Sequence, residues 1–349
     1  MSRRLAEVAA KVGVSEATVS RVLNEKPGVS DATRQAVLTA LDVLGYERPA
    51  KLRGDRGRLV GLVLPELQNP IFPAFAEVMG AALAQRAFIP LLCTQTAGGI
   101  AEADYVELLL QHHVSGVVFA GGNHAQAGAR HDHYARLAER GLPTVLINAS
   151  IDELPFSRVS CDDRVAAEQA MGHLLSLGHT EIGVLLGKPD HVPSRRKLEG
   201  ARTFADRNGI ALPDSRVVHA LYSLESGQAG AARLLQSGVT AIVCASDLLA
   251  LGAIRAVRRA GRAVPGDVSV TGFDDSVFMS LTEPPLTTVR QPIEAMGRAA
   301  VDVLAALIEG AETSADEMLF EPELVVRGST GASTRGQGSP TARSGPREP

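Results

Sequence analysis

The side chains with the clearest chemistry lie within residues 15–24, where short polar groups surround one arginine. The guanidinium of Arg21 can donate to both acceptors on the edge of a guanine base. Thr18, Ser20 and Asn24 suit phosphate oxygens, which set the register of a protein on DNA without reading its sequence. The predicted DNA contacts of this segment are Ser15, Glu16, Ala17, Thr18, Ser20, Arg21 and Asn24.

Three short helices are expected to position these side chains. A first helix ends near Gly13, which allows a tight turn, and Ser15 can cap a second helix. Ser30 can cap a third helix that ends at Gly45. The apolar stripes of the three helices would share one core of Leu5, Val8, Ala9, Val12, Val19, Val22, Leu23, Val37, Ala40, Leu41 and Leu44. This pattern favours a helix-turn-helix, and an ordinary helical hairpin is the alternative.

Charge is distributed unevenly along the chain. Residues 1–58 hold eleven Lys and Arg against seven Asp and Glu, whereas the whole chain carries a net charge of −4. A basic amino-terminal part on an acidic body is typical of a DNA-binding head joined to a separate domain.

The length of 349 residues, 45% of them hydrophobic, is enough for two or three packed units. No segment approaches the roughly 20 apolar residues of a membrane helix, and the amino terminus does not read as a signal peptide. We therefore expect a cytoplasmic protein that needs no membrane. Cys93, Cys161 and Cys244 are odd in number and lie in apolar surroundings, so buried reduced thiols are expected.

The body from residue 59 alternates short apolar runs with helical patterns, which predicts an α/β fold of parallel sheets covered by helices. The alternation forms two similar series that meet near residue 158, so two lobes are expected. Ligands of such sheets bind beyond the carboxyl ends of the strands, here between the lobes. The expected strands include 59–64, 89–93, 116–120, 144–148, 182–186, 241–245 and 268–271.

The chain resembles the LacI/GalR family of transcriptional regulators from residue 5 to about residue 327. The segments that carry the resemblance are 14–15, 18–24, 44–46, 69–72, 177–179, 246–252, 264–270, 272–275 and 284–291. The resemblance implies a head at residues 1–48, a linker at 49–58, a two-lobed body folded like periplasmic sugar-binding proteins at 59–327, and a tail at 328–349. The composition of that tail predicts disorder.

Family resemblance also implies a homodimeric repressor that binds a palindromic operator in double-stranded DNA and is released when a small sugar closes the lobes. It places base contacts at Glu16, Ala17 and Arg21. The implied effector contacts are Phe72, Asn148, Arg195, Arg196, Lys197, Tyr222, Ser246, Asp274 and Gln291. Carboxylates, amides and basic groups can bind sugar hydroxyls, and aromatic rings can cover an apolar sugar face. The alternatives are that Asp274 only caps a turn between a strand and a helix, and that Phe72 only fills the floor between the lobes.

The linker departs from the family pattern. Relatives insert a leucine of a longer linker helix between base pairs in the minor groove, and Leu52 is the one candidate here. The linker is shorter, and Gly54 and Gly57 interrupt it. Among subgroups, segments 15–17, 65–69, 102–106 and 192–197 are most similar to actinobacterial repressors of maltose and maltodextrin use.

Other classes of function remain as alternatives. A sugar-binding transport protein would share the two-lobed body, and a regulator of this family could use a non-sugar co-repressor. No nucleophile, phosphate-loop or metalloprotease motif indicates an enzyme, and no cofactor is expected. His124, His131 and His133 could form a metal site, although loop histidines are mostly solvated.

Dimerisation could use either of two amphipathic helices. One carries Phe75, Val78, Met79 and Ala82, and the other carries Tyr105, Leu108 and Leu109. Both helices could equally pack on a sheet of their own chain.

Overall fold

The computed structural model describes residues 2–24, 26–44, 46, 59–95, 98–311, 314 and 316–334. The predicted linker at 49–58, with Leu52, lies outside these residues. Among the described residues, no helix is long and apolar enough to span a membrane.

The head consists of three helices, as the apolar spacing predicts: α1 (Ser2–Val12), α2 (Glu16–Leu23) and α3 (Asp31–Val43). The backbone of Gly13 turns between α1 and α2 with a φ of +76°. Ser15 caps α2, because its Oγ accepts the N–H of Thr18 at 3.2 Å. The core between the helices contains Val8, Ala9, Val19, Val22, Val37, Leu38, Ala40 and Leu41.

The first lobe is built on a six-stranded sheet in the order β11-β5-β4-β3-β1-β2, and all of its strands are parallel. Its strands are β1 (Leu59–Leu64), β2 (Ile89–Thr94), β3 (Gly116–Ala120), β4 (Thr144–Ile147), β5 (Ser157–Cys161) and β11 (Glu317–Phe320). Its helices are α4 (Ile71–Gln85), α5 (Glu102–Gln111), α6 (Asp132–Glu139) and α11 (Ile293–Ile308).

The second lobe repeats this plan with the strand order β12-β10-β9-β8-β6-β7, in which only the edge pair β12 and β10 is antiparallel. Its strands are β6 (Ile182–Leu186), β7 (Val217–His219), β8 (Ala241–Cys244), β9 (Ser269–Asp274), β10 (Thr287–Arg290) and β12 (Glu323–Val325). Its helices are α7 (Asp163–Ser176), α8 (Val192–Arg207), α9 (Leu224–Gln236) and α10 (Asp247–Arg259).

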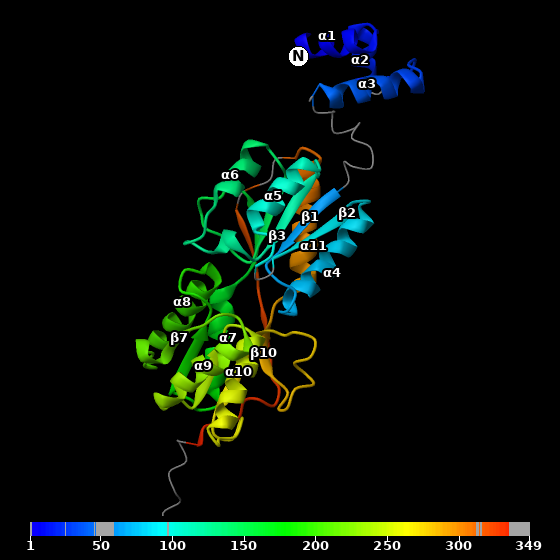
Figure 1. Ribbon diagram of the computed structural model, residues 1–349. Helices are drawn as coiled ribbons and strands as arrows, with labels where there is room; N and C mark the ends of the chain where they lie inside the picture. Colours follow the sequence, from blue (N-terminus) through cyan, green and yellow to red (C-terminus); the bar gives the residue numbers. More distant parts are fainter. Residues whose placement is uncertain are drawn as a thin grey trace, which may run out of the picture.

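The main chain passes between the lobes three times: from β5 to α7, from β10 to α11, and from β11 to β12. Figure 1 shows the two lobes one above the other, with these crossings between them. Because α11 returns to the first lobe and β12 to the second, each lobe is made of discontinuous pieces of sequence. The two-lobed α/β fold with parallel sheets is therefore confirmed.

The carboxyl-terminal boundary of the body differs from the prediction. Disorder was expected from residue 328, but Ser329 is fully buried, accepts the N–H of Thr287 at 2.8 Å and donates to the carbonyl of Val270 at 2.6 Å. The N–H of Ser333 donates to the carbonyl of Leu177. Residues 328–334 thus belong to the second lobe, because these backbone and hydroxyl groups find partners there. The rest of the predicted tail, 335–349, lies outside the described residues.

The three cysteines are buried and free, as their apolar surroundings predict. Burial raises the pKa of the Cys93 thiol to about 11, and it also raises the pKa values of Cys161 and Cys244. All three are therefore protonated thiols at neutral pH.

Candidate functional site

A cavity of about 190 Å³ opens where the carboxyl ends of the strands of both lobes meet. The strand pattern placed the pocket at these ends, and the family resemblance implied nine effector contacts. Seven of the nine line the cavity: Phe72, Asn148, Lys197, Tyr222, Ser246, Asp274 and Gln291.

The first lobe supplies an aromatic and amide wall. Phe72, in the first turn of α4, lies against Gly121, where a Cβ atom would come within 3.0 Å of its ring. Asn148 follows β4 and has a φ of +68°, which a non-glycine residue rarely adopts. The wall thus offers an apolar ring face beside a donor and acceptor pair.

The second lobe places a buried cation in the cavity. The ammonium of Lys197 on α8 forms an ion pair with Asp163, the first residue of α7, and lies 3.7 Å from the ring centroid of Phe273. Burial by itself would lower the pKa of Lys197, but the Asp163 carboxylate outweighs this and raises it. Burial raises the pKa of Asp163, although Lys197 opposes the rise. Lys197 therefore stays charged and can donate to an oxygen of a ligand.

Asp274 ends β9 with a φ of +113° and is buried, 4% exposed. Its Oδ1 accepts from Gln291 Nε2 at 2.6 Å. Burial, together with the neighbouring charge of Asp247, raises the pKa of Asp274 well above its ordinary value. Burial and a neighbouring charge disfavour the ionised form of this carboxyl group. Hydrogen bonds with uncharged hydroxyl groups of a ligand would therefore stabilise it.

Tyr222 and Ser246 complete the wall of the second lobe. The Tyr222 hydroxyl lies 3.0 Å from Ser194 Oγ, and its ring meets that of His191 edge-on, with centroids 5.8 Å apart. Gly187 makes room for this ring, since a Cβ there would lie 2.4 Å from the Tyr222 hydroxyl. Ser246 caps α10 by accepting the N–H of Leu249.

The lobes also touch at the edge of the cavity. Gln126 of the first lobe forms an antiparallel bridge with His191 of the second, and the N–H of Ala127 donates to the carbonyl of Asp190 at 3.0 Å. Burial lowers the pKa of His191 to about 3, so its ring is neutral at physiological pH. Both lobes therefore enclose the cavity.

Several lining residues were missed from the sequence: Glu66, Asn69, Gln126, Asp163, Lys188, His191 and Phe273. Asp163 and Lys188 follow strands β5 and β6, and that position could have indicated them. Gln126 and His191 lie on loops that meet only across the two lobes, and no local pattern marks them.

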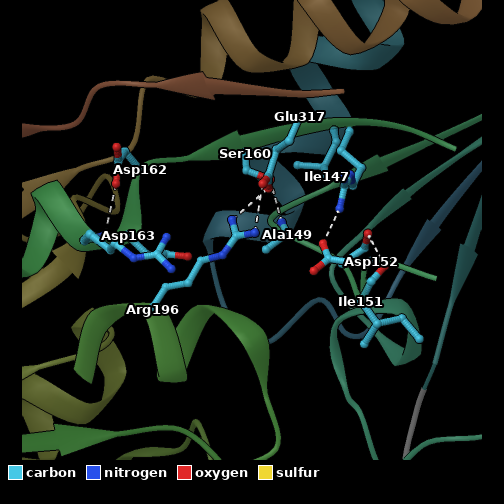
Figure 2. A network of polar contacts seen from close by, with 12 residues as sticks. Ile147, Ala149, Ile151, Asp152, Ser160, Asp162, Asp163, Arg196 and Glu317 are labelled. Atoms are coloured by element: carbon cyan, nitrogen blue, oxygen red, sulfur yellow. Dashed lines mark hydrogen bonds and ion pairs between the residues drawn. The ribbon is translucent and has the colours of Figure 1, made fainter. Parts of the chain in front are cut away.

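Arg195 and Arg196, by contrast, do not reach the cavity. Pro193 and Lys197 are four residues apart on α8, so they share the helix face that lines the cavity. Arg195 and Arg196 lie between them and point away from that face. Arg195 is exposed. Arg196 forms a two-pronged ion pair with Glu317 of the first lobe, with both nitrogen–oxygen distances 2.8 Å (Figure 2).

The predicted recognition helix α2 exposes Glu16, Ala17 and Arg21 while burying Val19 and Val22. The polar residues at its ends already have partners. Ser15 caps the helix, and Asn24 Nδ2 donates to the carbonyl of Ser20 at 2.8 Å. Arg21 thus stands on an exposed face where it could reach a base edge.

The histidines considered for a metal site bind other groups. His133 Nε2 lies 2.7 Å from buried Glu102, His131 Nε2 lies 2.9 Å from the carbonyl of Asn123, and His124 Nε2 lies 3.0 Å from that of Ile147. Across the described ranges, no group of three His, Cys, Asp or Glu side chains could hold a metal ion.

The two helices considered for dimerisation use much of their apolar surface inside the first lobe. On α4, the side chains of Phe75, Met79 and Ala82 are buried. Val78 packs closely against Gly297 of α11, since a Cβ atom at Gly297 would lie 2.8 Å from its Cγ1 atom. On α5, Leu109 is buried, whereas Leu108 is partly exposed. The buried side chains of both helices therefore pack within their own lobe, which is the alternative to a dimer interface.

Two family models match the chain. The model of bacterial regulatory proteins of the lacI family matches residues 4–49, and the model of the periplasmic binding protein-like domain matches residues 171–330.

Full-length relatives agree with these matches. The chain is 52% identical to the transcriptional regulator reg1 of Streptomyces lividans and 51% identical to MalR of Streptomyces coelicolor, covering 97% of this chain and 100% of each relative. A structure of the regulator CelR with cellobiose is 34% identical with a TM-score of 0.72, covering 93% of this chain and 99% of that one. A lac repressor dimer bound to operator and the anti-inducer ONPF is 29% identical with a TM-score of 0.71, covering 93% and 98%.

These relatives are transcriptional regulators rather than enzymes. The three-helix head, the two-lobed body and the full-length similarity lead to one conclusion: the chain belongs to the LacI family of bacterial transcriptional regulators.

Proposed function

We propose that this regulator represses sugar-utilisation genes and leaves its operator when a small sugar fills the interlobe cavity. The observation that carries the proposal is the cavity itself, which combines Asp274, Gln291, Lys197 and Asn148 with the ring of Phe72. Such a wall suits a ligand with many hydroxyl groups and one apolar face. The proposed division is a head at 1–48, a linker at 49–58 and an effector-binding body that extends to about residue 334.

The proposed effector is maltose or a short maltodextrin. Support comes from the resemblance to actinobacterial repressors of maltose use and from the relative named MalR. The similar regulator CelR was solved with cellobiose, which is also a disaccharide. Because a few atoms of the cavity decide the choice of sugar, related folds do not fix it.

DNA binding is assigned to α2, with Arg21 on a base edge. A single head covers only half a site, so a two-fold dimer on a palindromic operator is proposed. The similar lac repressor structure is a dimer on its operator.

Exposed apolar side chains offer a surface for this homodimer. They lie on the edge strand β2, at Ile89 and Leu92, and on the loop after β9, at Val277, Phe278 and Leu281. Val277, Phe278 and Leu281 lie within five residues of one another on one loop, and neighbouring exposed apolar groups are costly in water and often mark a protein interface. In Figure 1 both segments lie on the right-hand side of the body.

Effector binding would act by favouring one arrangement of the lobes. Closure around the sugar moves the first lobes of the dimer and thus the two heads. A coupling of about 1–3 kcal/mol is enough to lower operator occupancy usefully.

Calorimetric titration with maltose, maltotriose, cellobiose, glucose and ribose tests the effector assignment. The proposal requires binding of maltose or maltotriose that is at least about tenfold tighter than binding of the others, a difference of about 1.4 kcal/mol. Preference for another sugar would replace the effector, and binding of none would contradict the sugar assignment.

A further inference from the structure

Arg196 connects the two lobes through a well-defined ion pair. It extends from α8 in the second lobe to Glu317 on β11 in the first, and each of its terminal nitrogens donates to one carboxylate oxygen at 2.8 Å (Figure 2). The side chains are only 14% and 13% exposed. A two-pronged pair with so little exposure is far better ordered than an ordinary surface ion pair.

Glu317 continues the connection into the first lobe. Burial by itself would raise the pKa of Glu317, but hydrogen bonds from Arg196 and Ser160 hold it below its ordinary value. Ser160 lies on the neighbouring strand β5 and is fully buried. Its hydroxyl donates to Glu317, so its remaining lone pairs are available to accept.

Ser160 also restrains the backbone turn at residues 148–149, at the edge of the cavity. Its Oγ accepts the N–H of Ala149 at 2.7 Å. Ala149 and Asn148 have φ values of +63° and +68°, which residues with a Cβ rarely adopt unless their surroundings hold them. Asn148 lines the cavity. A chain of polar contacts thus runs from Arg196 through Glu317 and Ser160 to the backbone of Ala149, the residue that follows Asn148.

We propose that Arg196 and Glu317 are positioning residues, whose interlobe ion pair fixes the turn that aims Asn148 into the effector cavity. The pair orients the Glu317 carboxylate, which holds the Ser160 hydroxyl, and Ser160 restrains the left-handed backbone at Ala149. If the lobes move apart, the pair breaks and the restraint on Asn148 is weakened. The effect on effector binding rests on the proposed function, whereas the effect on the turn does not.

The second lobe offers a matched control. Arg164 of α7 pairs with Glu199 of α8, but both belong to the second lobe and are about half exposed, 51% and 54%. The Arg164→Met substitution removes a guanidinium of the same kind and leaves the polar contacts between the lobes in place. Arg196→Met keeps most of the aliphatic stem of the side chain and removes only the fork.

Hydrogen exchange of the sugar-free protein tests the restraint directly. Mass spectrometry would follow a peptide that covers residues 147–151 in the wild type, Arg196→Met, Glu317→Gln, Ser160→Ala and Arg164→Met. We expect at least about tenfold faster exchange at the Ala149 amide in the first three variants and no change in Arg164→Met. Unchanged exchange in Arg196→Met, or equal acceleration in Arg164→Met, would overturn the proposal.

Effector affinity provides the second measurement, with maltose and the other sugars above as probes. Arg196→Met and Asn148→Ala should each weaken binding at least about fivefold, and the double variant should be no weaker than Asn148→Ala alone, because both act through one side chain. Additive losses would show that Arg196 acts by another route. A wild type that binds none of the sugars contradicts the proposed function and leaves the exchange result to decide on the positioning role.

Discussion

Gln291 and Asp274 meet where two adjacent strands of the second lobe end. Gln291 Nε2 donates to Asp274 Oδ1 at 2.6 Å, and β9 and β10 are parallel with Arg290 opposite Asp274. Gln291 Oε1 is buried and has no hydrogen-bond partner within the described part of the chain. Because Gln291 also begins a crossing to the first lobe, a ligand that satisfies this oxygen would contact the connection between the lobes.

Asp274→Asn should yield a regulator that still binds operator but responds weakly to sugar. The amide keeps the size of the side chain, and its oxygen can still accept from Gln291 Nε2. An NH2 group then replaces the second carboxyl oxygen, so hydroxyl donors of the effector lose an acceptor and binding should weaken by about 1–3 kcal/mol. Calorimetry with the preferred sugar measures the loss. Unchanged sugar affinity in this variant would remove Asp274 from the effector contacts.

Arg21→Ala should weaken specific operator binding by about 1–3 kcal/mol, since a two-pronged contact with guanine would be lost. Sugar affinity and the melting temperature should stay unchanged because Arg21 is exposed on the head. A mobility-shift titration against operator and scrambled DNA measures the effect. Equal losses on both DNAs would mean that Arg21 contacts phosphate rather than a base.

Asp247 should make stability depend on pH in a defined direction. Burial raises its pKa from 3.8 to about 6, so the folded state binds a proton more tightly than the unfolded state does. Its contribution to the free energy of unfolding is therefore fully present below about pH 4 and is lost as the pH rises through about 6. Urea denaturation at several pH values should show a smaller decline across this window in Asp247→Asn than in the wild type. Parallel curves for the two proteins would refute this assignment.

Gly187→Ala should disturb the cavity through Tyr222. The added methyl group would lie 2.4 Å from the Tyr222 hydroxyl, so the ring must move and its contact with Ser194 must change. Effector affinity should fall at least about tenfold, or about 1.4 kcal/mol. Gly80→Ala on α4 is the matched control, because a Cβ there meets only Pro90 at 3.9 Å. Equal sugar affinity in the two variants would contradict the placement of Tyr222.

Phe278→Asp should break the proposed homodimer, because it places a charge among the exposed apolar side chains of the loop after β9. Sedimentation should show a monomer at concentrations where the wild type is a dimer, and operator affinity should fall with it. Val326→Asp changes another exposed apolar residue, beyond β12, and should leave the dimer intact. A dimeric Phe278→Asp variant would locate the interface elsewhere.

The head was predictable because its signals are local. The apolar spacing, Gly13 and the Ser15 cap all lie within a few residues of the turns that they determine. Seven of the nine effector contacts implied by the family resemblance also line the cavity, and residues such as Asp274 lie at the carboxyl ends of strands.

The ion pair of Arg196 could not be predicted in the same way. Its partner Glu317 is 121 residues away in the sequence, on a strand that returns to the first lobe. The strands and the helix from residue 287 onward were not anticipated, so the second and third crossings and the interlobe pair could not be inferred. Which of three adjacent basic residues faces the cavity depends on the rotation of α8, and only the packed structure sets that rotation.

Fluorescence anisotropy tests the central claim most directly. Palindromic DNA from the upstream region of the regulator's own gene would be titrated with protein at fixed salt, without sugar and with saturating maltose or maltotriose. We expect tight binding to the palindrome and at least about a tenfold loss of affinity with one of these sugars, in line with a coupling of 1–3 kcal/mol. Tighter binding with sugar would indicate a co-repressor, and binding that neither prefers the palindrome nor changes with sugar would contradict the account of a sugar-released repressor.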